Sequence, residues 1–239
     1  MKILPVMLLL ATGASASAIE PRGIPVYSKC YDSANAHGSY NTFTTYVPDL
    51  RAFTYNNVIS SVVNDGVWIY YDDFNYEGTL LLVAGIDGTT NFGSIYGNKA
   101  SSLRFAGSQD CMNCERWILY EGTSYTGSEF YGTNDTPILG SFSARANSII
   151  TIGESYWTFY DGDSYTGHSV CVRPNHFLYA GQVKLIFGIY PFVTNLGLAN
   201  NAIRSVKSGC HSKNMVASVE LEVLESTNNT RVLALSSLN

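Results

Sequence analysis

The chain of 239 residues is predicted to be all-β, with two Greek-key sandwich domains built from four motifs. Three observations support this class. A hairpin pattern recurs at regular spacing; Tyr and Gly are abundant while charged residues are only 14%; and short aromatic or β-branched runs are bounded by turn residues. Outside the N-terminal leader, no window longer than about ten residues keeps the apolar period of a helix. Internal repetition therefore decides the architecture.

The repeat is an aromatic residue, two residues, Tyr followed by Asp or Glu, three residues, a second Tyr, one residue and Gly. The complete copies are Trp68–Gly78, Trp117–Gly127 and Trp157–Gly167. A degraded copy begins at Tyr31-Asp32 and ends at Gly38, with Ala36 or His37 near the place of the second Tyr. The copies are spaced as two pairs joined by a connector, which indicates two domains.

Each copy predicts a hairpin that folds back sharply on its own sheet. The Gly is needed because the backbone must adopt a positive φ there, and the two aromatic rings can stack across the fold. The expected strands are 67–71, 79–84, 117–120 and 157–160. Short helical turns are expected near 49–53 or 192–198.

An Asn/Ser-rich turn that leads into a strand follows each copy, at 56–61, 97–102, 146–151 and 200–205. A hairpin with a returning strand, repeated four times, is typical of Greek keys. From about 26 to 209 the chain resembles the βγ-crystallin superfamily, which implies two domains of two packed sheets each. The predicted organisation is a signal peptide at 1–18, a first domain at 26–107 (motifs 26–64 and 67–107), a linker at 108–115, a second domain at 116–210 (motifs 116–152 and 156–209) and a tail at 211–239.

The resemblance also implies calcium binding in the first domain. Family members that bind calcium use a clamp of the form [Asn/Asp]-[Asn/Asp]-x-x-[Ser/Thr]-Ser from each motif, and amide, hydroxyl and carbonyl oxygens suit this ion. The first clamp, 56–61, matches completely, and 97–102 misses only its first position. The candidate ligands are Asn56, Asn57, Val58, Ser60, Asn98, Lys99, Ser101 and the hairpin residue Asp73. The competing interpretation is that these turns are only structural corners.

The second domain is expected to bind calcium poorly. Ile150 and Arg204 are interpreted as replacing the Ser or Thr of its two clamps, and Arg204 also adds a positive charge.

The N-terminus reads as a secretory signal, with Lys2, an apolar run at 3–10 and a small-residue exit at 16–18. In an exported chain, five cysteines suggest two disulfide bonds and one free thiol. We expect Cys171 to pair with Cys210, since both fall in the fourth repeat, and by analogy of position Cys30 to pair with Cys111 or Cys114. The Cys111–Cys114 spacing also fits a redox pair, but a structural role is favoured.

Several classes of function are disfavoured. The net charge of −5, without a basic run, argues against nucleic acid, and no later segment is long enough for a membrane span. The histidines at 37, 168, 176 and 211 have no metal-binding spacing, and no nucleophile-elbow motif occurs. We therefore expect a non-catalytic extracellular protein, with calcium as ligand and an extracellular protein as candidate partner.

The segment at 175–195 is rich in apolar residues and lengthens the fourth motif. It is interpreted as a long loop or extra hairpin packed on the second domain. As a partner-binding surface it would instead support an alternative function, a protease inhibitor or a defence or toxin-like protein. One further strand is expected within 216–224 of the tail.

Overall fold

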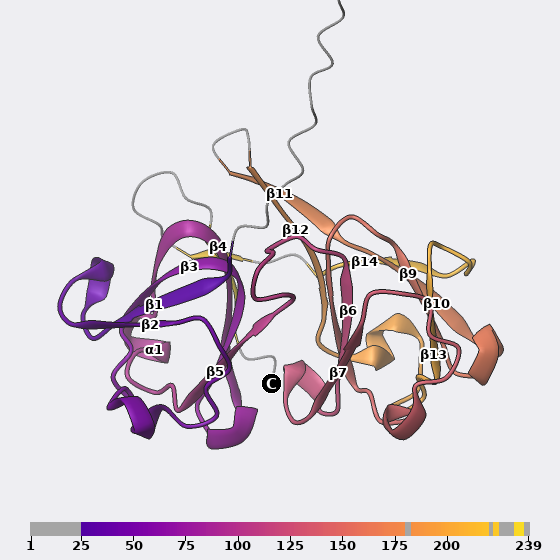
Figure 1. Cartoon of the computed structure of the whole chain (residues 1–239), viewed down its shortest axis with the longest axis horizontal. Coiled ribbons are helices and arrows are strands. Elements are labelled where there is room, and N and C mark those ends of the chain that lie inside the picture. Colours follow the sequence, from indigo (N-terminus) through magenta and orange to yellow (C-terminus); the bar gives the residue numbers. More distant parts are fainter. Residues whose placement is uncertain (1–24, 180–182, 220–221, 225–231, 237–239) are drawn as a thin grey trace, which may run out of the picture.

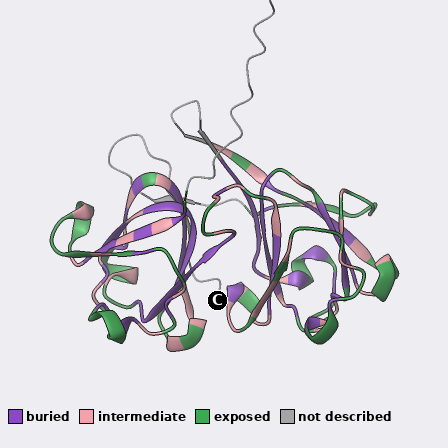
Figure 2. Cartoon of the chain, in the orientation of Figure 1, coloured by how far each residue is buried: buried purple, intermediate pink, exposed green. Residues whose placement is uncertain are grey.

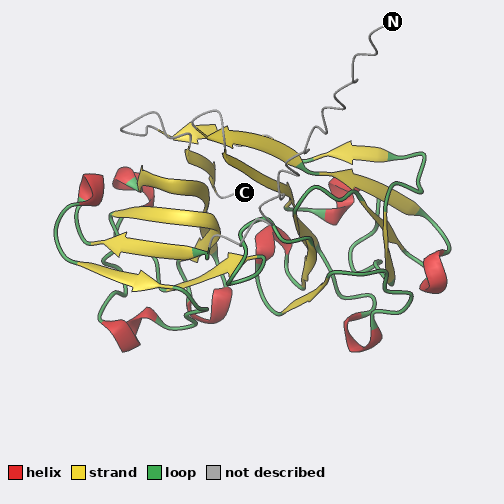
Figure 3. Cartoon of the chain, turned by 45° about the horizontal axis from the view of Figure 1, so that its top comes forward, coloured by secondary structure: helices red, strands yellow, loops and turns green. Residues whose placement is uncertain are grey.

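The computed structural model describes residues 25–179, 183–219, 222–224 and 232–236. The predicted signal peptide lies outside this part of the chain. The described residues form two β-rich domains side by side, with only single turns of helix between strands (Figures 1 and 3). The all-β, Greek-key prediction is confirmed. No helix among the described residues has the length and apolarity needed to cross a membrane.

The first domain is built on a seven-stranded sheet. Its strands are β1 (Tyr27–Tyr31), β2 (Tyr40–Phe43), β3 (Ser61–Tyr71), β4 (Thr79–Asn91), β5 (Ser102–Ala106), β15 (Glu222–Leu224) and β16 (Val232–Ser236), in the order β15-β16-β4-β3-β1-β2 with β5 also on β3. β3 serves two layers, because its first half pairs with β1 and its second half with β5. The register shifts between Asn64 and Asp65, next to Gly66 at φ 91°, so the strand changes layer there.

The second domain has two sheets. The first joins β6 (Arg116–Tyr120), β7 (Glu129–Gly132), β8 (Ser148–Ile152), β11 (Asn175–Tyr179) and β12 (Val183–Tyr190) in the order β11-β12-β8-β6-β7. The second joins β9 (Trp157–Tyr160), β10 (Ser169–Arg173), β13 (Ser205–Ser208) and β14 (Met215–Ala217) in the order β13-β9-β10-β14. The strands expected at 67–71, 79–84, 117–120 and 157–160 all form.

The helical turns are η1 (Ala34–Ala36), η2 (Leu50–Phe53), η3 (Phe74–Tyr76), α1 (Gly93–Tyr96), η4 (Thr123–Tyr125), η5 (Gly140–Phe142), η6 (Asp163–Tyr165) and η7 (Val193–Leu196). Both turns expected at 49–53 and 192–198 are present. Four of the eight, η1, η3, η4 and η6, lie inside the repeated hairpins.

The repeated hairpins have the predicted geometry. The Gly that closes each one has a positive φ, between 62° and 82°. In the complete copies the two Tyr rings contact each other in edge-to-face or tilted arrangements, with centroids 5.6–5.9 Å apart. In the degraded copy Ala36, at φ 56°, takes the place of the second Tyr, which has φ 64–66° in the others. That hairpin keeps its backbone without the aromatic pair.

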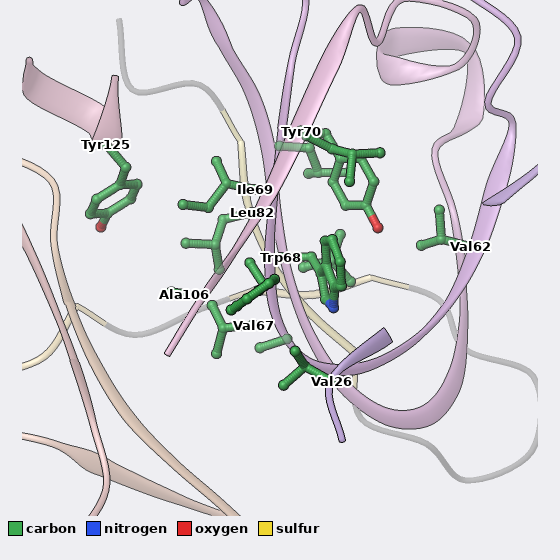
Figure 4. Packing of buried hydrophobic residues seen from close by; sticks show 14 of the residues in the cluster. Val26, Val62, Val67, Trp68, Ile69, Tyr70, Leu82, Ala106 and Tyr125 are labelled. Carbon is green, nitrogen blue, oxygen red and sulfur yellow. The ribbon is translucent and has the colours of Figure 1, made fainter. Parts of the chain in front are cut away.

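A continuous apolar core joins the two domains. Along β3, Trp68 and Tyr70 point toward Val62, whereas Ile69 points toward Tyr125 of the second domain (Figure 4). The cluster extends through Ile118, Ile150, Ile152, Leu185, Phe187 and Ile189. A second cluster around Trp117, Trp157 and Phe159 belongs to the second domain, and buried strands fill both domains in Figure 2. The domain contact is therefore apolar at its centre.

Arg104 of β5 lies buried at this contact. Its guanidinium donates to the Tyr71 hydroxyl at 2.9 Å and to the carbonyls of Tyr125 and Gly127 at 2.6 and 3.0 Å. Glu129 of β7 lies 3.7 Å from Arg104 Nη1 and accepts a hydrogen bond from the Tyr46 hydroxyl at 2.6 Å. The buried cation thus links hairpins of both domains.

The 175–195 segment contains an extra hairpin, as one of the two interpretations predicted. β11 pairs with β12, and the inner half of β12 pairs with β8. Phe177 stacks on Phe187 with centroids 4.7 Å apart, and Phe187 is buried in the shared core. In place of the one strand expected within 216–224, the structure has two short strands, β14 and β15, which belong to different sheets.

One cysteine prediction is confirmed and one is wrong. Cys171 and Cys210 form a disulfide bond, as expected. Cys111 and Cys114 bond to each other, so Cys30 pairs with neither of them. The reason is burial: Cys30 points inward from β1 and contacts the Ser28 hydroxyl at 3.2 Å, whereas Cys114 lies exposed in the turn between the domains.

Candidate calcium clamps

Backbone hydrogen bonds identify the equivalent clamp positions in the four motifs. In each motif, the amide at the fifth position donates to the carbonyl of the first Tyr of the hairpin at 2.7–2.9 Å. These donors are Ser60, Ser101, Asn147 and Arg204. The next residue is a Ser whose hydroxyl donates to the carbonyl of the second residue after that Tyr (Ser61, Ser102, Ser148 and Ser205).

These contacts correct the prediction for the third motif. Ile150 is not a clamp position; it lies three residues further, inside β8. Asn147 occupies the fifth position. The sequence pattern placed Asn147 at the second position of the clamp, because Asn-Ser resembles the beginning of a clamp. The hydrogen bonds show that this Asn-Ser pair is the end of the clamp. Arg204 holds the fifth position of the fourth motif, as expected.

The two clamps of the first domain are related by a local two-fold arrangement. The amide of Asn57 donates to the Ala100 carbonyl and the amide of Asn98 donates to the Ile59 carbonyl, both at 2.9 Å. Both Asn residues are left-handed, with φ of 56° and 58°, a conformation that Asn tolerates better than most residues. The Asn98 side chain reaches the first clamp, where its Oδ1 lies 3.0 Å from the Ser60 hydroxyl.

Three oxygen atoms converge at Ser60. Its hydroxyl lies 2.9 Å from the Asp32 carbonyl oxygen and 3.0 Å from Asn98 Oδ1. A hydroxyl has one proton and can satisfy one of these acceptors at a time. The arrangement has more acceptors than donors, which suits a hard cation that takes oxygen ligands. Asp32 enters this set through its backbone and was not a predicted ligand.

Further unsatisfied oxygens surround the same clamps. Asn56 Oδ1 is buried and has no hydrogen-bond partner among the described residues. Within that part of the chain, the carbonyls of Val58 and Lys99 also accept no hydrogen bond. A bound cation would satisfy groups of this kind.

The remaining predicted ligands belong to the second of the two related sites, the one around Ser101. By the local two-fold arrangement, Ser101 and Asn57 correspond to Ser60 and Asn98. The carbonyl of Asp73 is occupied by the Ser102 hydroxyl at 2.7 Å. Burial raises the pKa of the neighbouring Asp72, the negative charge of Asp73 adds to this, and Lys99 opposes it. The positive charge of Lys99 therefore acts on the site around Ser101, where it would oppose the binding of a cation.

In the second domain the same space is filled by an amide. Asn147 Nδ2 donates to the Glu121 carbonyl at 2.7 Å and to Asn201 Oδ1 at 2.8 Å, and Asn147 Oδ1 accepts from the Asn201 amide at 3.1 Å. These contacts take the place of those made by Ser60 in the first domain. The amide group of Asn147 has two protons, so both acceptors receive a hydrogen bond, whereas the single Ser60 proton serves one acceptor at a time. No sequence pattern signalled this, because Asn is itself a common ligand type.

The described residues contain no group of three or more His, Cys, Asp or Glu side chains placed to hold a metal ion. A cation in the first domain would therefore be held by neutral oxygens.

Two segments match known families. Residues 28–105 match the model of the Beta/Gamma crystallin family, and residues 118–172 match that of Peptidase inhibitor family I36. No curated protein is significantly similar in sequence to the chain.

Solved structures with this fold are also similar to the chain. Geodin, a βγ-crystallin from Geodia cydonium, is 19% identical over 77% of this chain and 99% of its own, with a TM-score of 0.56. A βγ-crystallin from an archaeon is 26% identical over 40% of this chain and 98% of its own, with a TM-score of 0.31. One from Ciona intestinalis is 25% identical over 38% and 96%, with a TM-score of 0.29.

Proposed function

We propose that this chain, a member of the βγ-crystallin superfamily, is a secreted, non-catalytic protein that binds calcium weakly through its first domain. Its role would be structural or protective outside the cell. The domain boundaries given above, 26–107 and 116–210 with a linker at 108–115, belong to the same proposal. The tail adds to both domains, because β15 and β16 join the sheet of the first domain and β14 joins a sheet of the second.

The observation that carries the calcium proposal is the oxygen set around Ser60. Its hydroxyl faces two acceptors, Asn98 Oδ1 and the Asp32 carbonyl, and can satisfy one at a time. The clamps supply neutral oxygens, and charge count tunes calcium affinity, so we expect a dissociation constant no better than micromolar. The second domain should bind poorly because Asn147 already donates to the equivalent acceptors.

Secretion is supported by two features. The leader sequence fits a signal peptide. The structure also has two disulfide bonds, which persist in oxidising compartments.

Calorimetric titration with calcium tests the proposal. Binding to the native state raises the free energy of unfolding by RT ln(1 + [Ca²⁺]/Kd), about 1.4 kcal/mol at ten times Kd. Ser60→Arg should abolish one site and leave the fold intact, whereas Ser94→Arg, at an exposed serine of α1, should change neither. Identical thermal melting in EDTA and in several millimolar calcium would refute calcium binding.

A second candidate function is peptidase inhibition, which the match of 118–172 to family I36 favours. The inhibitory element would be the neighbouring β11–β12 hairpin, which extends the edge of the five-stranded sheet. A panel of proteases assayed with the intact protein tests this. Deleting the edge strand β11 would relieve inhibition if the proposal is correct, whereas no inhibition of any protease would exclude it.

A further inference from the structure

A pocket of about 320 Å³ lies between the two domains, apart from the clamps. Its walls come from three places: Tyr46 and Phe105 of the first domain, the turn at 107–110, and Arg116 and Tyr131 of the second domain. β5 and β6, which carry Phe105 and Arg116, flank this region (Figure 1). Contacts between domains are a common place for small-molecule sites.

Aromatic rings form the apolar part of the pocket. Tyr46 and Phe105 pack edge to face with centroids 4.8 Å apart. Tyr131 of β7 remains 51% exposed, and the Arg116 guanidinium lies 4.3 Å from the centre of its ring. This cation–π contact holds an exposed ring at the mouth. A ligand with an apolar face could pack on these rings.

The polar part offers donors and acceptors without net charge. Arg116 Nη1 donates to the Gly107 carbonyl at 2.8 Å, which fixes the guanidinium in place. Arg116 Nε is buried and has no partner among the described residues. Asp110 and Gln109 supply carboxylate and amide groups at the same pocket. One cation and one carboxylate balance each other, which disfavours a strongly charged ligand.

We propose that this pocket binds a neutral saccharide. A pyranose ring has an aliphatic face that can pack on Tyr131 and a rim of hydroxyl groups that both donate and accept. Arg116 would donate to such hydroxyls, Asp110 would accept from them, and Gln109 can do both. A carboxylate ligand would meet Asp110, and a purely apolar ligand would leave these polar groups unpaired. The site is independent of calcium binding.

Saturation-transfer difference NMR on the full chain tests the proposal, with methyl α-mannoside, methyl β-galactoside and methyl N-acetyl-β-glucosaminide as neutral probes. Glucuronate and acetate serve as charged probes. All samples contain EDTA, so the result does not depend on the clamps. We expect at least one neutral glycoside to bind and Tyr131→Ala to weaken it at least tenfold. The matched control is Tyr40→Ala, which removes a similarly exposed ring (55%) from β2 and should leave binding unchanged.

Three results would overturn the proposal: no signal from any neutral glycoside, equal binding by the Tyr131→Ala variant, or acetate and glucuronate binding as tightly as the neutral probes. Far-ultraviolet circular dichroism of both variants distinguishes loss of the site from loss of the fold.

Discussion

Replacing Arg104 by Met should destabilise the protein through the charge left behind. Met retains most of the apolar stem but removes the hydrogen bonds to Tyr71, Tyr125 and Gly127. It also leaves the Glu129 carboxylate at the domain contact without its cation, 3.7 Å away in the native protein. The side chains of this pair are only 2% and 11% exposed, so water cannot replace the lost partner.

The expected cost is about 3–5 kcal/mol, the usual effect of breaking a buried ion pair by removing one partner. A matched surface change sets the scale. Arg51 pairs with Asp49 at 2.7 Å, but its side chain is 63% exposed. Arg51→Met should therefore change the free energy of unfolding by no more than about 0.5 kcal/mol.

The loss of stability caused by Arg104→Met should depend on pH. Burial raises the pKa of Glu129 above its ordinary value, while Arg104 and the Tyr46 hydroxyl lower it, so removing Arg104 raises it further. A carboxyl whose folded pKa exceeds its unfolded pKa binds more protons when folded. Stability then falls as pH rises from the unfolded to the folded pKa, by at most about 1.4 kcal/mol per pH unit. The Arg104→Met variant should be least destabilised near pH 4 and most at neutral pH.

Urea unfolding of the native protein, Arg104→Met and Arg51→Met between pH 4 and 8 measures how the free energy of unfolding depends on pH. Adding Glu129→Gln to Arg104→Met removes the stranded charge, so the double variant should lose the extra pH dependence and recover part of the stability. A destabilisation by Arg104→Met that is the same at every pH, or additive single and double variants, would refute the role of Glu129.

Three further predictions concern single features of the chain. Gly78→Val should destabilise the first domain, because φ is +62° there and an added Cβ would clash with Asp72 Oδ1. Thermal melting measures this effect, and an unchanged melting temperature would contradict it. Replacing Cys171 and Cys210 together by Ser opens a loop of sequence separation 39 and should lower the free energy of unfolding by about 4 kcal/mol on the chain-entropy model. Removing the Cys111–Cys114 bond, with a separation of 3, should lower it by only about 1.5 kcal/mol, and equal losses in urea unfolding would argue against loop entropy. Asn147→Ser should restore the Ser60 arrangement and add a weak calcium site to the second domain, and calorimetry with one unchanged site would disprove it.

The hairpins were predictable because their requirements are local. A positive φ at Gly78 and the Tyr71–Tyr76 contact depend on residues within one turn of chain, and both occur as expected. The first clamp was readable for the same reason, since Asn56 to Ser61 match a contiguous pattern. In the third motif local pattern misled, because two registers of an Asn-Ser turn are similar in sequence and only the hydrogen bond from Asn147 to Tyr120 distinguishes them.

The sequence by itself determined the all-β class and the four repeats, because both follow from residue types at regular spacing. It also determined the Cys171–Cys210 bond, because both cysteines fall within the fourth repeat. The tertiary structure alone decided which distant groups meet. It isolated Cys30 inside a sheet, and it buried Arg104 between domains. The physical reason is that burial and charge pairing depend on contacts across the chain, between residues such as Arg104 and Glu129 that share no local pattern.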